Sequence, residues 1–413
     1  MAPNPQAAYA QWVDACANAG WPGASAPERV PVANGLGRVS AGEVRARWPV
    51  PPFACAAMDG IAIAARSVAA LADAPGLARL AASSFSWVDT GDALPAGTDT
   101  VVERERVEPG ADGSVQVTGP IPRGLHVRTQ GEDFPAGRLL IPAGHGLRPV
   151  DLAVAAAAGH ATLMVARRPL VAIIPTGDEV RPAGVALGPG EVTDSNSLML
   201  ASRARESGAQ TLVTDVQPDH PDVIAAALAD AAITADLVLV IAGSSVGRRD
   251  HTASVLARAG GVAVHGVAVR PGHPVLLGHV TAGLERSGGR GQIVPAIGVP
   301  GYPLAAAVIF ELFAVPLIAA LRGERRPDRE VLRARLGCDW TSSADVEDWV
   351  PVSLAPAAAE PDPGAVLVAT PGRRGAAAIS RLLLANAWWR IPVGQAKFVR
   401  GEHISVHPMP RAP

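Results

Sequence analysis

Short apolar runs alternate with longer amphipathic segments between residues 170 and 321. The runs have the length of buried parallel strands and lie at 170–174, 211–214, 237–241 and 294–297. Helices are predicted between or after them, at 196–207, 221–232, 250–259 and 304–321. Strand–helix alternation over this length predicts a central, doubly wound, mostly parallel α/β domain.

The segments on either side of this region have different patterns of apolar and turn-forming residues. Residues 1–25 are predicted to be helical and to join residues 168–322 in the α/β domain. Residues 47–137 contain many prolines, glycines and β-branched residues in short runs, which predicts a β-rich inserted lobe. Residues 323–413 return to short strands with proline-rich spacers and predict a small C-terminal β-barrel-like domain.

Two further segments are predicted to form a mixed linker domain. They are residues 26–46 and 138–167, the second with a short strand at 138–141 and an alanine-rich helix from Asp151. The predicted fold class is therefore multidomain, α/β plus β.

The composition narrows the class of protein. The chain has 413 residues, of which 48% are apolar and 18% charged, and its formal net charge is −2. This balance is typical of a folded protein with several domains and argues against a general nucleic-acid surface. The three cysteines, Cys16, Cys55 and Cys338, are scattered, which argues against a disulfide framework and favours a reducing compartment.

No cationic region followed by an apolar run, the pattern of a signal peptide, is evident at the N-terminus. The longest apolar stretch, Leu304–Leu321, is interrupted by Glu311 and Pro316, which favours a core helix over a membrane span. We therefore expect a cytoplasmic protein without membrane or nucleic-acid partners.

Three glycine-containing loops follow predicted strands of the α/β domain, where ligands collect in such sheets. The first, Pro175–Val180, has Gly177 for a sharp turn and the carboxylate of Glu179. The second, Ala242–Asp250, is rich in small residues that let backbone N–H groups approach an oxyanion. The third, Gly298–Pro303, is stiffened by prolines.

Each loop also has a purely structural explanation. A glycine loop after a strand is most often a plain turn, and Asp250 and Asp219 are both placed to be helix N-caps. Asp194-Ser-Asn could simply begin the helix at residue 196. The conjunction of three loops with carboxylates nearby nevertheless indicates a cleft for an oxyanion-bearing ligand, with a divalent metal held by the acids.

Six motifs, in order along nearly the whole chain, resemble those of the molybdopterin molybdenumtransferases, bacterial relatives of the C-terminal part of gephyrin. They are Pro51–Gly60 (PPFACAAMDG), Asp89–Val102 (DTGDALPAGTDTVV), Arg128–Asp133 (RTQGED), Pro175–Val180 (PTGDEV), Asp194–Asn196 (DSN) and Gly298–Gly301 (GVPG). Any one motif is weak, whereas six in register are a specific signal.

The resemblance implies an enzyme of molybdenum cofactor biosynthesis. In that family, molybdate is inserted into adenylylated molybdopterin with Mg²⁺-dependent release of AMP, and carboxylates suit the binding of Mg²⁺. The resemblance also implies a homodimer, in which Asp59 of one chain reaches the α/β cleft of its partner. A molybdopterin adenylyltransferase or a molybdoenzyme is a further expected partner.

The same resemblance assigns roles to individual residues. The implied catalytic residues are Asp59, Thr90, Asp133, Glu179, Asp219 and Asp250. The last three are the implied metal ligands. Binding of the pterin nucleotide and the oxyanion falls to Gly177, Asp194, Ser195, Gly243, Ser244, Ser245, Gly247, Arg270, His273, Pro300, Gly301 and Pro303.

Several positions depart from the family pattern. Ser244 replaces a glycine of SGGVSVG, and KPGKP reads Arg270-Pro-Gly-His-Pro. A further lysine position corresponds to Gly266, and Tyr302 stands in the PGNP loop. Arg270 keeps a cation, but the net loss of positive charge should weaken the binding of anions.

These departures leave two alternatives open. One is a diverged, non-catalytic paralogue that holds molybdopterin or the finished cofactor as a carrier or scaffold. The other is an enzyme acting on a sugar or nucleotide phosphate on the same scaffold. Arg373 and Arg374, in the stretch that corresponds to the family's GSG…ARAN, could restore some positive charge.

Overall fold

The computed structural model describes most of the chain. The described residues are 2–71, 76–241, 251–283, 292–325, 330–356, 367–372, 375 and 379–409. The chain divides into two compact units, Glu28–Val165 and the remainder, which comprises Met1–Pro27 and Ala166–Pro413. The finer division into four domains stays a prediction.

The larger unit is built on a six-stranded sheet. Its strands, in spatial order, are β16 (Gln210–Val213), β13 (Leu170–Pro175), β17 (Leu237–Ile241), β21 (Gln292–Val299), β20 (Leu276–Ala282) and β18 (Gly260–His265). The first four run parallel, and β20 is antiparallel to both of its neighbours. The mostly parallel sheet that the alternation predicts is confirmed.

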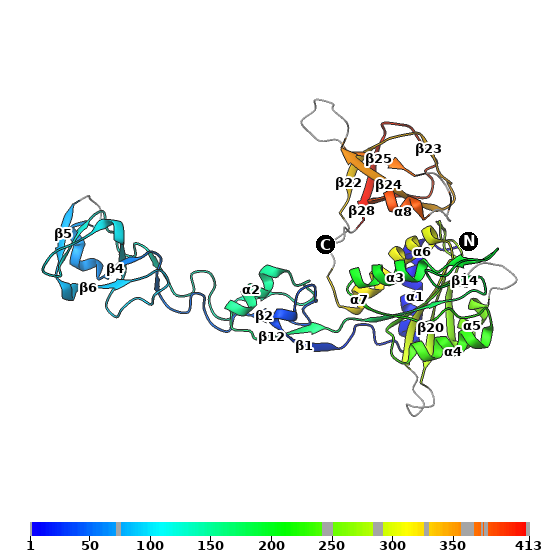
Figure 1. The fold of residues 1–413 in the computed structure, drawn as a ribbon, viewed down its shortest axis with the longest axis horizontal. Coiled ribbons are helices and arrows are strands. Elements are labelled where there is room, and N and C mark those ends of the chain that lie inside the picture. Colours follow the sequence, from blue (N-terminus) through cyan, green and yellow to red (C-terminus); the bar gives the residue numbers. More distant parts are fainter. Residues whose placement is uncertain are drawn as a thin grey trace. The chain divides into compact units, whose positions relative to one another are not determined.

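Two helical layers cover the two faces of this sheet (Figure 1). One layer consists of α1 (Pro5–Ala19), α3 (Asn196–Glu206), α6 (Pro303–Ile309) and α7 (Val315–Leu321). The other consists of α4 (Pro221–Ala232) and α5 (Thr252–Ala259). Within β13, Val171 and Ile173 enter the first core, whereas Ala172 and Ile174 enter the second. The strand is apolar throughout because both of its faces are buried.

The apolar segment Pro303–Leu321 is a core helix, as predicted. It is long and apolar enough to cross a membrane, but 78% of its most apolar window is buried inside the fold. The carboxylate of Glu311 accepts a hydrogen bond from Arg203 Nε at 2.5 Å, which satisfies a charge buried in this layer. A π-helical turn, Phe310–Ala314, separates α6 from α7, so the predicted single α-helix is interrupted.

Three element predictions need correction. The run 211–214 is not a buried strand, because β16 lies at the sheet edge and leaves Leu212 and Val213 largely exposed. The strands β18 and β20 were not predicted. The N-terminal helix is shorter than residues 1–25, since Gly20 ends it at φ 105°, a left-handed conformation that favours glycine.

The C-terminal part of this unit is a closed five-stranded barrel, which confirms the predicted β-barrel-like domain. Its strands are β24 (Glu347–Pro356), β25 (Leu367–Pro371), β22 (Leu332–Leu336), β28 (His403–Pro408) and β26 (Ala387–Ile391). Pairing of β26 with β24 closes the barrel. The short strand β19 (Val269–Arg270) also pairs with β24, in parallel, and joins the barrel to the α/β region.

The smaller unit is rich in short strands, as predicted for the inserted lobe. One three-stranded sheet contains β6 (Phe85–Val88), β4 (Gly60–Ile63) and β7 (Thr100–Glu103). A second contains β5 (Leu77–Leu80), β9 (Val115–Thr118) and β8 (Val107–Pro109). Paired short strands complete the unit: β1 (Pro27–Pro31) with β12 (Thr162–Ala166), β2 (Val44–Arg45) with β11 (Leu139–Ile141), and β3 (Cys55–Ala56) with β10 (Val127–Arg128).

The helix of this unit, α2 (Pro149–Ala157), begins two residues before the predicted start at Asp151. The buried carboxylate of Asp151 accepts hydrogen bonds from the backbone N–H and the guanidinium of Arg148, and His145 Nε2 lies 2.9 Å from it. The hydrogen bonds of the Arg148 side chain hold the pKa of Asp151 well below its usual range.

Replacing Asp151 with Asn should therefore destabilise the smaller unit at neutral pH, by roughly 1–3 kcal/mol. The pKa of Asp151 is lower in the folded than in the unfolded protein. Its contribution to the free energy of unfolding is therefore complete above the unfolded pKa of about 3.9, and it is lost as the pH falls toward the folded pKa. Chemical unfolding of the full chain between pH 3 and pH 7 should show this slope in the wild type and a flatter one in the variant. Equal slopes would show that Asp151 contributes no linkage.

Candidate functional site

Carboxylates gather at the carboxyl edge of the parallel sheet. The loop after β13 is tied to the segment after β16, since Gly177 N–H donates to the Gln217 carbonyl at 3.0 Å. Asp219 N–H donates to Asp178 Oδ1 at 3.2 Å. Gly177 has φ 142°, and a Cβ there would lie 2.6 Å from Val180 Cγ2, so the turn requires glycine. The two loops therefore bring their acids to one place.

The acids of these loops interact electrostatically. Partial burial raises the pKa of Asp219, and the nearby charges of Glu179 and Asp178 raise it further, whereas His251 opposes them. Asp219 is not the N-cap of α4, because that position is occupied by His220. Among the described residues, two further acids thus lie near Asp219 and their charges outweigh that of His251, an arrangement that a bound cation would relieve.

The predicted ligand set reaches beyond the described residues. Glu179 and Asp219 lie together, but Asp250 falls in the segment 242–250, which lies outside the described residues, as do Gly243, Ser244, Ser245 and Gly247. Within the described part of the chain, no three His, Cys, Asp or Glu side chains are placed to hold a metal ion.

Two other predicted loops meet at the start of α3. Ser195 is the N-cap residue of this helix, and Asp194 Oδ1 accepts a hydrogen bond from Ser197 N–H at 3.0 Å. Asn196 Nδ2 donates to the Gly301 carbonyl at 2.7 Å and so joins α3 to the loop before α6. Asp194 therefore caps the first turn of α3, as expected if this segment simply begins the helix. The amide of Asn196 holds the two loops together.

The loop before α6 is only partly buried. Pro300 is buried at the end of β21, and Pro303 is the first residue of α6. Tyr302 is 62% exposed. Among these loop residues, Tyr302 therefore offers a side chain to solvent and to ligands.

The two cationic candidates have different partners. Arg270 Nη2 donates to Asp348 Oδ2 of the barrel at 2.7 Å. His273 Nδ1 lies 2.7 Å from the carbonyl oxygen of Val267 and donates to it, which leaves Nε2 for other contacts. Gly266, with φ 83°, lies beneath the imidazole of His273: a Cβ there would be 3.7 Å from its Nε2.

A cavity of about 260 Å³ lies beside Arg270, between α6 and the barrel. Its lining residues are Arg270, Pro271, Leu304, Trp340, Asp348, Trp349, Val350, Pro351, Gly375 and Arg381. Arg381 Nη2 is buried and has no hydrogen-bond partner among the described residues, and burial lowers the pKa of this guanidinium. Nη1 of the same half-buried guanidinium donates to the Gly375 carbonyl at 3.4 Å, so the unsatisfied Nη2 indicates a place for an anion.

Arg381 was not predicted as a site residue. It lies in α8 (Ser380–Leu384), within the stretch that corresponds to the family's GSG…ARAN motif. That stretch directed attention to Arg373 and Arg374, which lie outside the described residues. The feature of the sequence that could have indicated Arg381 is a single arginine followed by three leucines in a short helix.

The remaining predicted residues lie in the smaller unit. Asp59 Oδ1 accepts hydrogen bonds from Thr90 N–H at 2.6 Å and from Thr90 Oγ1 at 2.7 Å. The hydroxyl and the N–H of Thr90, with a smaller contribution from Arg104, lower the pKa of Asp59. Asp133 instead accepts a hydrogen bond from Arg128 Nη2 at 2.9 Å. The structure thus pairs Asp59 with Thr90 and gives Asp133 a separate partner.

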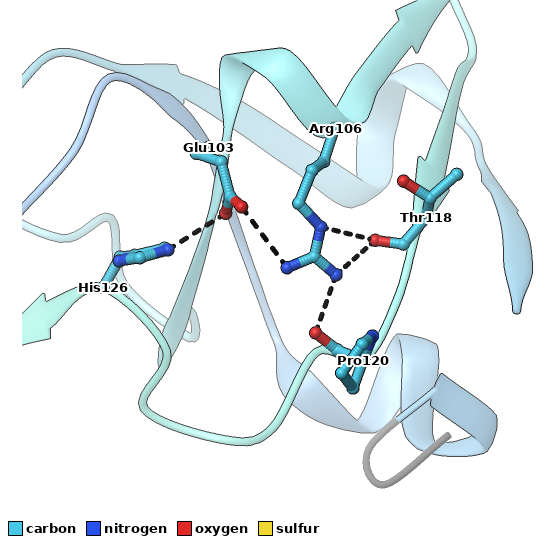
Figure 2. A network of polar contacts seen from close by, with 5 residues as sticks. All are labelled: Glu103, Arg106, Thr118, Pro120 and His126. Atoms are coloured by element: carbon cyan, nitrogen blue, oxygen red, sulfur yellow. Dashed lines mark hydrogen bonds and ion pairs between the residues drawn. The ribbon is translucent and has the colours of Figure 1, made fainter. Parts of the chain in front are cut away.

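The turn that carries Asp59 is braced from two sides. The carbonyl of Asp59 accepts from Arg104 N–H at 3.0 Å, and Ala57 N–H donates to the carbonyl of His126 at 2.9 Å. His126 has φ 49°, a conformation unusual for a residue other than glycine. Its Nε2 lies 3.0 Å from Glu103 Oε2. Glu103 also contacts Arg106, and Figure 2 shows how the three side chains face one another. The network connects the two segments that hold the turn.

Three family profiles match successive parts of the chain. The profile described as the MoeA N-terminal region (domain I and II) matches residues 6–159, and one described as a probable molybdopterin binding domain matches residues 172–320. The profile of the MoeA C-terminal region (domain IV) matches residues 333–409. Together they span nearly the whole chain in the order that the motifs indicate.

Curated relatives support the same assignment. A Mycobacterium tuberculosis protein named molybdopterin molybdenumtransferase 2 is 32% identical over 337 residues, which cover 76% of this chain and 80% of the relative. The chain belongs to the molybdopterin molybdenumtransferase family. The Synechococcus elongatus molybdopterin molybdenumtransferase is 29% identical over 92% of this chain and 94% of its own length.

A solved structure of the family has the same fold. The molybdopterin biosynthesis moea protein from Pyrococcus horikosii superposes with a TM-score of 0.80 and 28% identity, covering 99% of both chains. Within the family's regions, Glu179, Asp219 and Arg270 fall in the probable molybdopterin binding domain. Asp59 falls in the N-terminal region and Arg381 in the C-terminal one.

Replacing Thr90 with Val should raise the pKa of Asp59 toward its ordinary value, because the largest stabilising contact of the carboxylate is the Thr90 hydroxyl. Replacing Thr90 with Ser, which keeps the hydroxyl, should leave that pKa near the wild-type value. NMR titration of the Asp59 side-chain carboxyl carbon measures both. Identical titration curves for the wild type and Thr90→Val would refute this account of the depressed pKa.

Proposed function

We propose that this member of the family inserts molybdenum from molybdate into adenylylated molybdopterin. Water cleaves the phosphoanhydride bond of the adenylate, so AMP leaves and the terminal phosphate stays on the pterin. The two dithiolene thiols bind molybdenum and one molybdate oxygen leaves as water. The observation that carries the proposal is the group of acids at the carboxyl edge of the sheet, within the probable molybdopterin binding domain. Carboxylates there suit a divalent cation and a phosphoanhydride ligand.

The residues that would hold Mg²⁺ are Glu179 and Asp219, together with Asp250. The donor chemistry fits, because carboxylate oxygens are preferred ligands of Mg²⁺. Burial, and after it the like charges of Glu179 and Asp178, raise the pKa of Asp219, and a cation would offset those charges. When bound, Mg²⁺ supplies charge neutralisation for the phosphoryl oxygens. The turn at Gly177 and the contact between Asp219 N–H and Asp178 keep these acids in place.

The oxyanion would bind in the cavity beside the barrel. Arg381 and Arg270 line it and can donate charge-assisted hydrogen bonds to oxyanion oxygens. Trp340 and Trp349 line the same cavity and suit a planar ring system. The buried, unsatisfied Nη2 of Arg381 supports this choice of location.

We further propose a cytoplasmic homodimer in which Asp59 of one chain serves the acids of the other. The proposal rests on the family resemblance and on the position of Asp59 in a different compact unit from Glu179 and Asp219. A molybdopterin adenylyltransferase or a molybdoenzyme remains the expected protein partner.

One observation favours a second candidate function, a non-catalytic carrier of the pterin or the finished cofactor. Arg270, the cation retained at the altered lysine positions, is already paired with Asp348. A site with less available positive charge would bind a multiply charged nucleotide more weakly. Restoration of cofactor synthesis by this chain in a strain that lacks the transferase would exclude the carrier.

The direct test of catalysis is AMP release from adenylylated molybdopterin by the purified full chain, with and without Mg²⁺ and molybdate. Glu179→Gln and Asp219→Asn should each reduce the rate by roughly a hundredfold, since each removes a charge that stabilises the metal-bound reacting group. Asp219→Asn should not lower the melting temperature, because the ionised carboxyl is disfavoured where it lies. No AMP from well-folded wild-type protein would reject the transferase proposal.

Mixing two inactive variants tests the shared site. Heterodimers formed from Asp59→Asn and Asp219→Asn chains contain one intact composite site if Asp59 acts on the partner, so about a quarter of wild-type activity should return. If each chain builds its own site, every site carries a substitution and the mixture stays inactive. Size-exclusion chromatography with light scattering verifies that the chains are dimeric and exchange.

A further inference from the structure

A buried acid lies in the cavity that we assign to the oxyanion. Asp348 is only 5% exposed, yet its carboxylate lines the cavity. It accepts hydrogen bonds from Ser342 Oγ at 2.8 Å and from Arg270 Nη2 at 2.7 Å. An acid at this position opposes the binding of an anion, so its presence calls for an explanation.

The acid and its arginine differ in how firmly they are held. Asp348 belongs to β24, where its backbone pairs with β19 on one side and β26 on the other, and Ser342 holds its carboxylate. The side chain of Arg270 is 46% exposed, and its long stem has several rotamers available. When the pair opens, Arg270 is therefore the partner that moves.

The charges of the described lining residues favour an exchange of partners. They are the two guanidinium groups of Arg270 and Arg381 and the single carboxylate of Asp348. Without ligand, Asp348 neutralises one guanidinium, while the buried Nη2 of Arg381 has no hydrogen-bond partner among the described residues. An arriving oxyanion can satisfy Arg381 and then compete with Asp348 for Arg270.

We propose that Asp348 is a placeholder anion, which holds Arg270 until an oxyanion takes its place and thereby limits the affinity of the cavity for tetrahedral dianions. The inference rests on the proposed function, because it takes the cavity as the site of molybdate or of a phosphate monoester. Arg270 is then a residue with two partners. The altered lysine positions are part of the same arrangement, since the retained cation is the one that Asp348 regulates.

The direction in which one substitution changes the affinity for molybdate distinguishes this role from a structural one. Asp348→Asn keeps the shape and a hydrogen-bonding side chain but removes the competing charge. If Asp348 is a placeholder, the variant binds molybdate about tenfold more tightly, since removal of one like charge a few ångströms away has an effect of this size. If Asp348 serves only to hold Arg270 and the barrel in place, the same variant binds molybdate more weakly.

The neighbouring residue provides a matched control. Glu347 is equally buried on β24, but its carboxylate contacts Trp349 Nε1 and Arg390, and it does not line the cavity. Glu347→Gln removes the same charge one residue away and should change molybdate affinity less than twofold. A gain as large as that of Asp348→Asn would show a general field effect and overturn the assignment to Asp348.

The experiment is isothermal titration calorimetry of the full-length wild type and both variants with sodium molybdate, AMP and sodium nitrate. Molybdate and AMP distinguish a free oxyanion from a phosphate monoester, and nitrate is a monoanion. The gain in Asp348→Asn should be larger for the dianions than for nitrate, because repulsion by Asp348 scales with ligand charge. Unchanged or weaker dianion binding in the folded variant would contradict the proposal.

A second measurement needs no variant. In crystals of the wild-type protein soaked in molybdate, the anomalous signal of molybdenum should lie in the cavity, and Arg270 should have left Asp348 for the oxyanion. Molybdenum in the cavity with the Arg270–Asp348 pair intact overturns the placeholder role but leaves the proposed function standing. Absence of molybdate from the cavity removes the site itself, and the inference with it.

Discussion

Burial of both faces of a parallel sheet is the constraint on which the rest of this protein depends. The central strands β13, β17 and β21 send alternate side chains into two separate cores, and apolar side chains from helices complete both cores. Within those layers a polar group is tolerated only with a partner, as for Glu311 and Arg203. Polar groups that act on a ligand must therefore lie where the strands end.

The strand ends bring like charges together at a cost. Burial raises the pKa of Asp219, and the charges of Glu179 and Asp178 raise it further, as expected for acids gathered at one place. Backbone contacts hold them there: Gly177 N–H binds the Gln217 carbonyl, and Asp219 N–H binds Asp178. The cavity beside the barrel has the opposite imbalance, since Nη2 of Arg381 lacks a hydrogen-bond partner among the described residues. A bound cation would offset the first imbalance, and a bound oxyanion would offset the second.

Pattern and motif predicted different parts of this arrangement. Apolar runs predicted that β13 and β17 are buried on both faces, because every residue of such a strand faces a core. The same rule failed for β16, where an apolar run lies at an edge and is exposed. The antiparallel strands β18 and β20 were missed because neither forms a continuous apolar run: Gly260 and Gly261 begin β18, and Gly278 and His279 interrupt β20. Among the candidate residues, Glu179 and Asp219 lie together, whereas Asp133 contacts Arg128.

By itself, the sequence determined the fold class and the barrel-like domain at the C-terminus through the order of apolar runs and turns. It indicated the membership of the family through motifs in register along the chain. Only the tertiary structure decided which charges meet. Arg270 and Asp348 are far apart in the sequence and become partners because β19 pairs with β24. Arg381 becomes a cavity residue for the same reason: the barrel covers the α/β region there. An apolar run shows that a segment is buried, but it does not show which distant segment packs against it. The tertiary structure therefore decides these contacts.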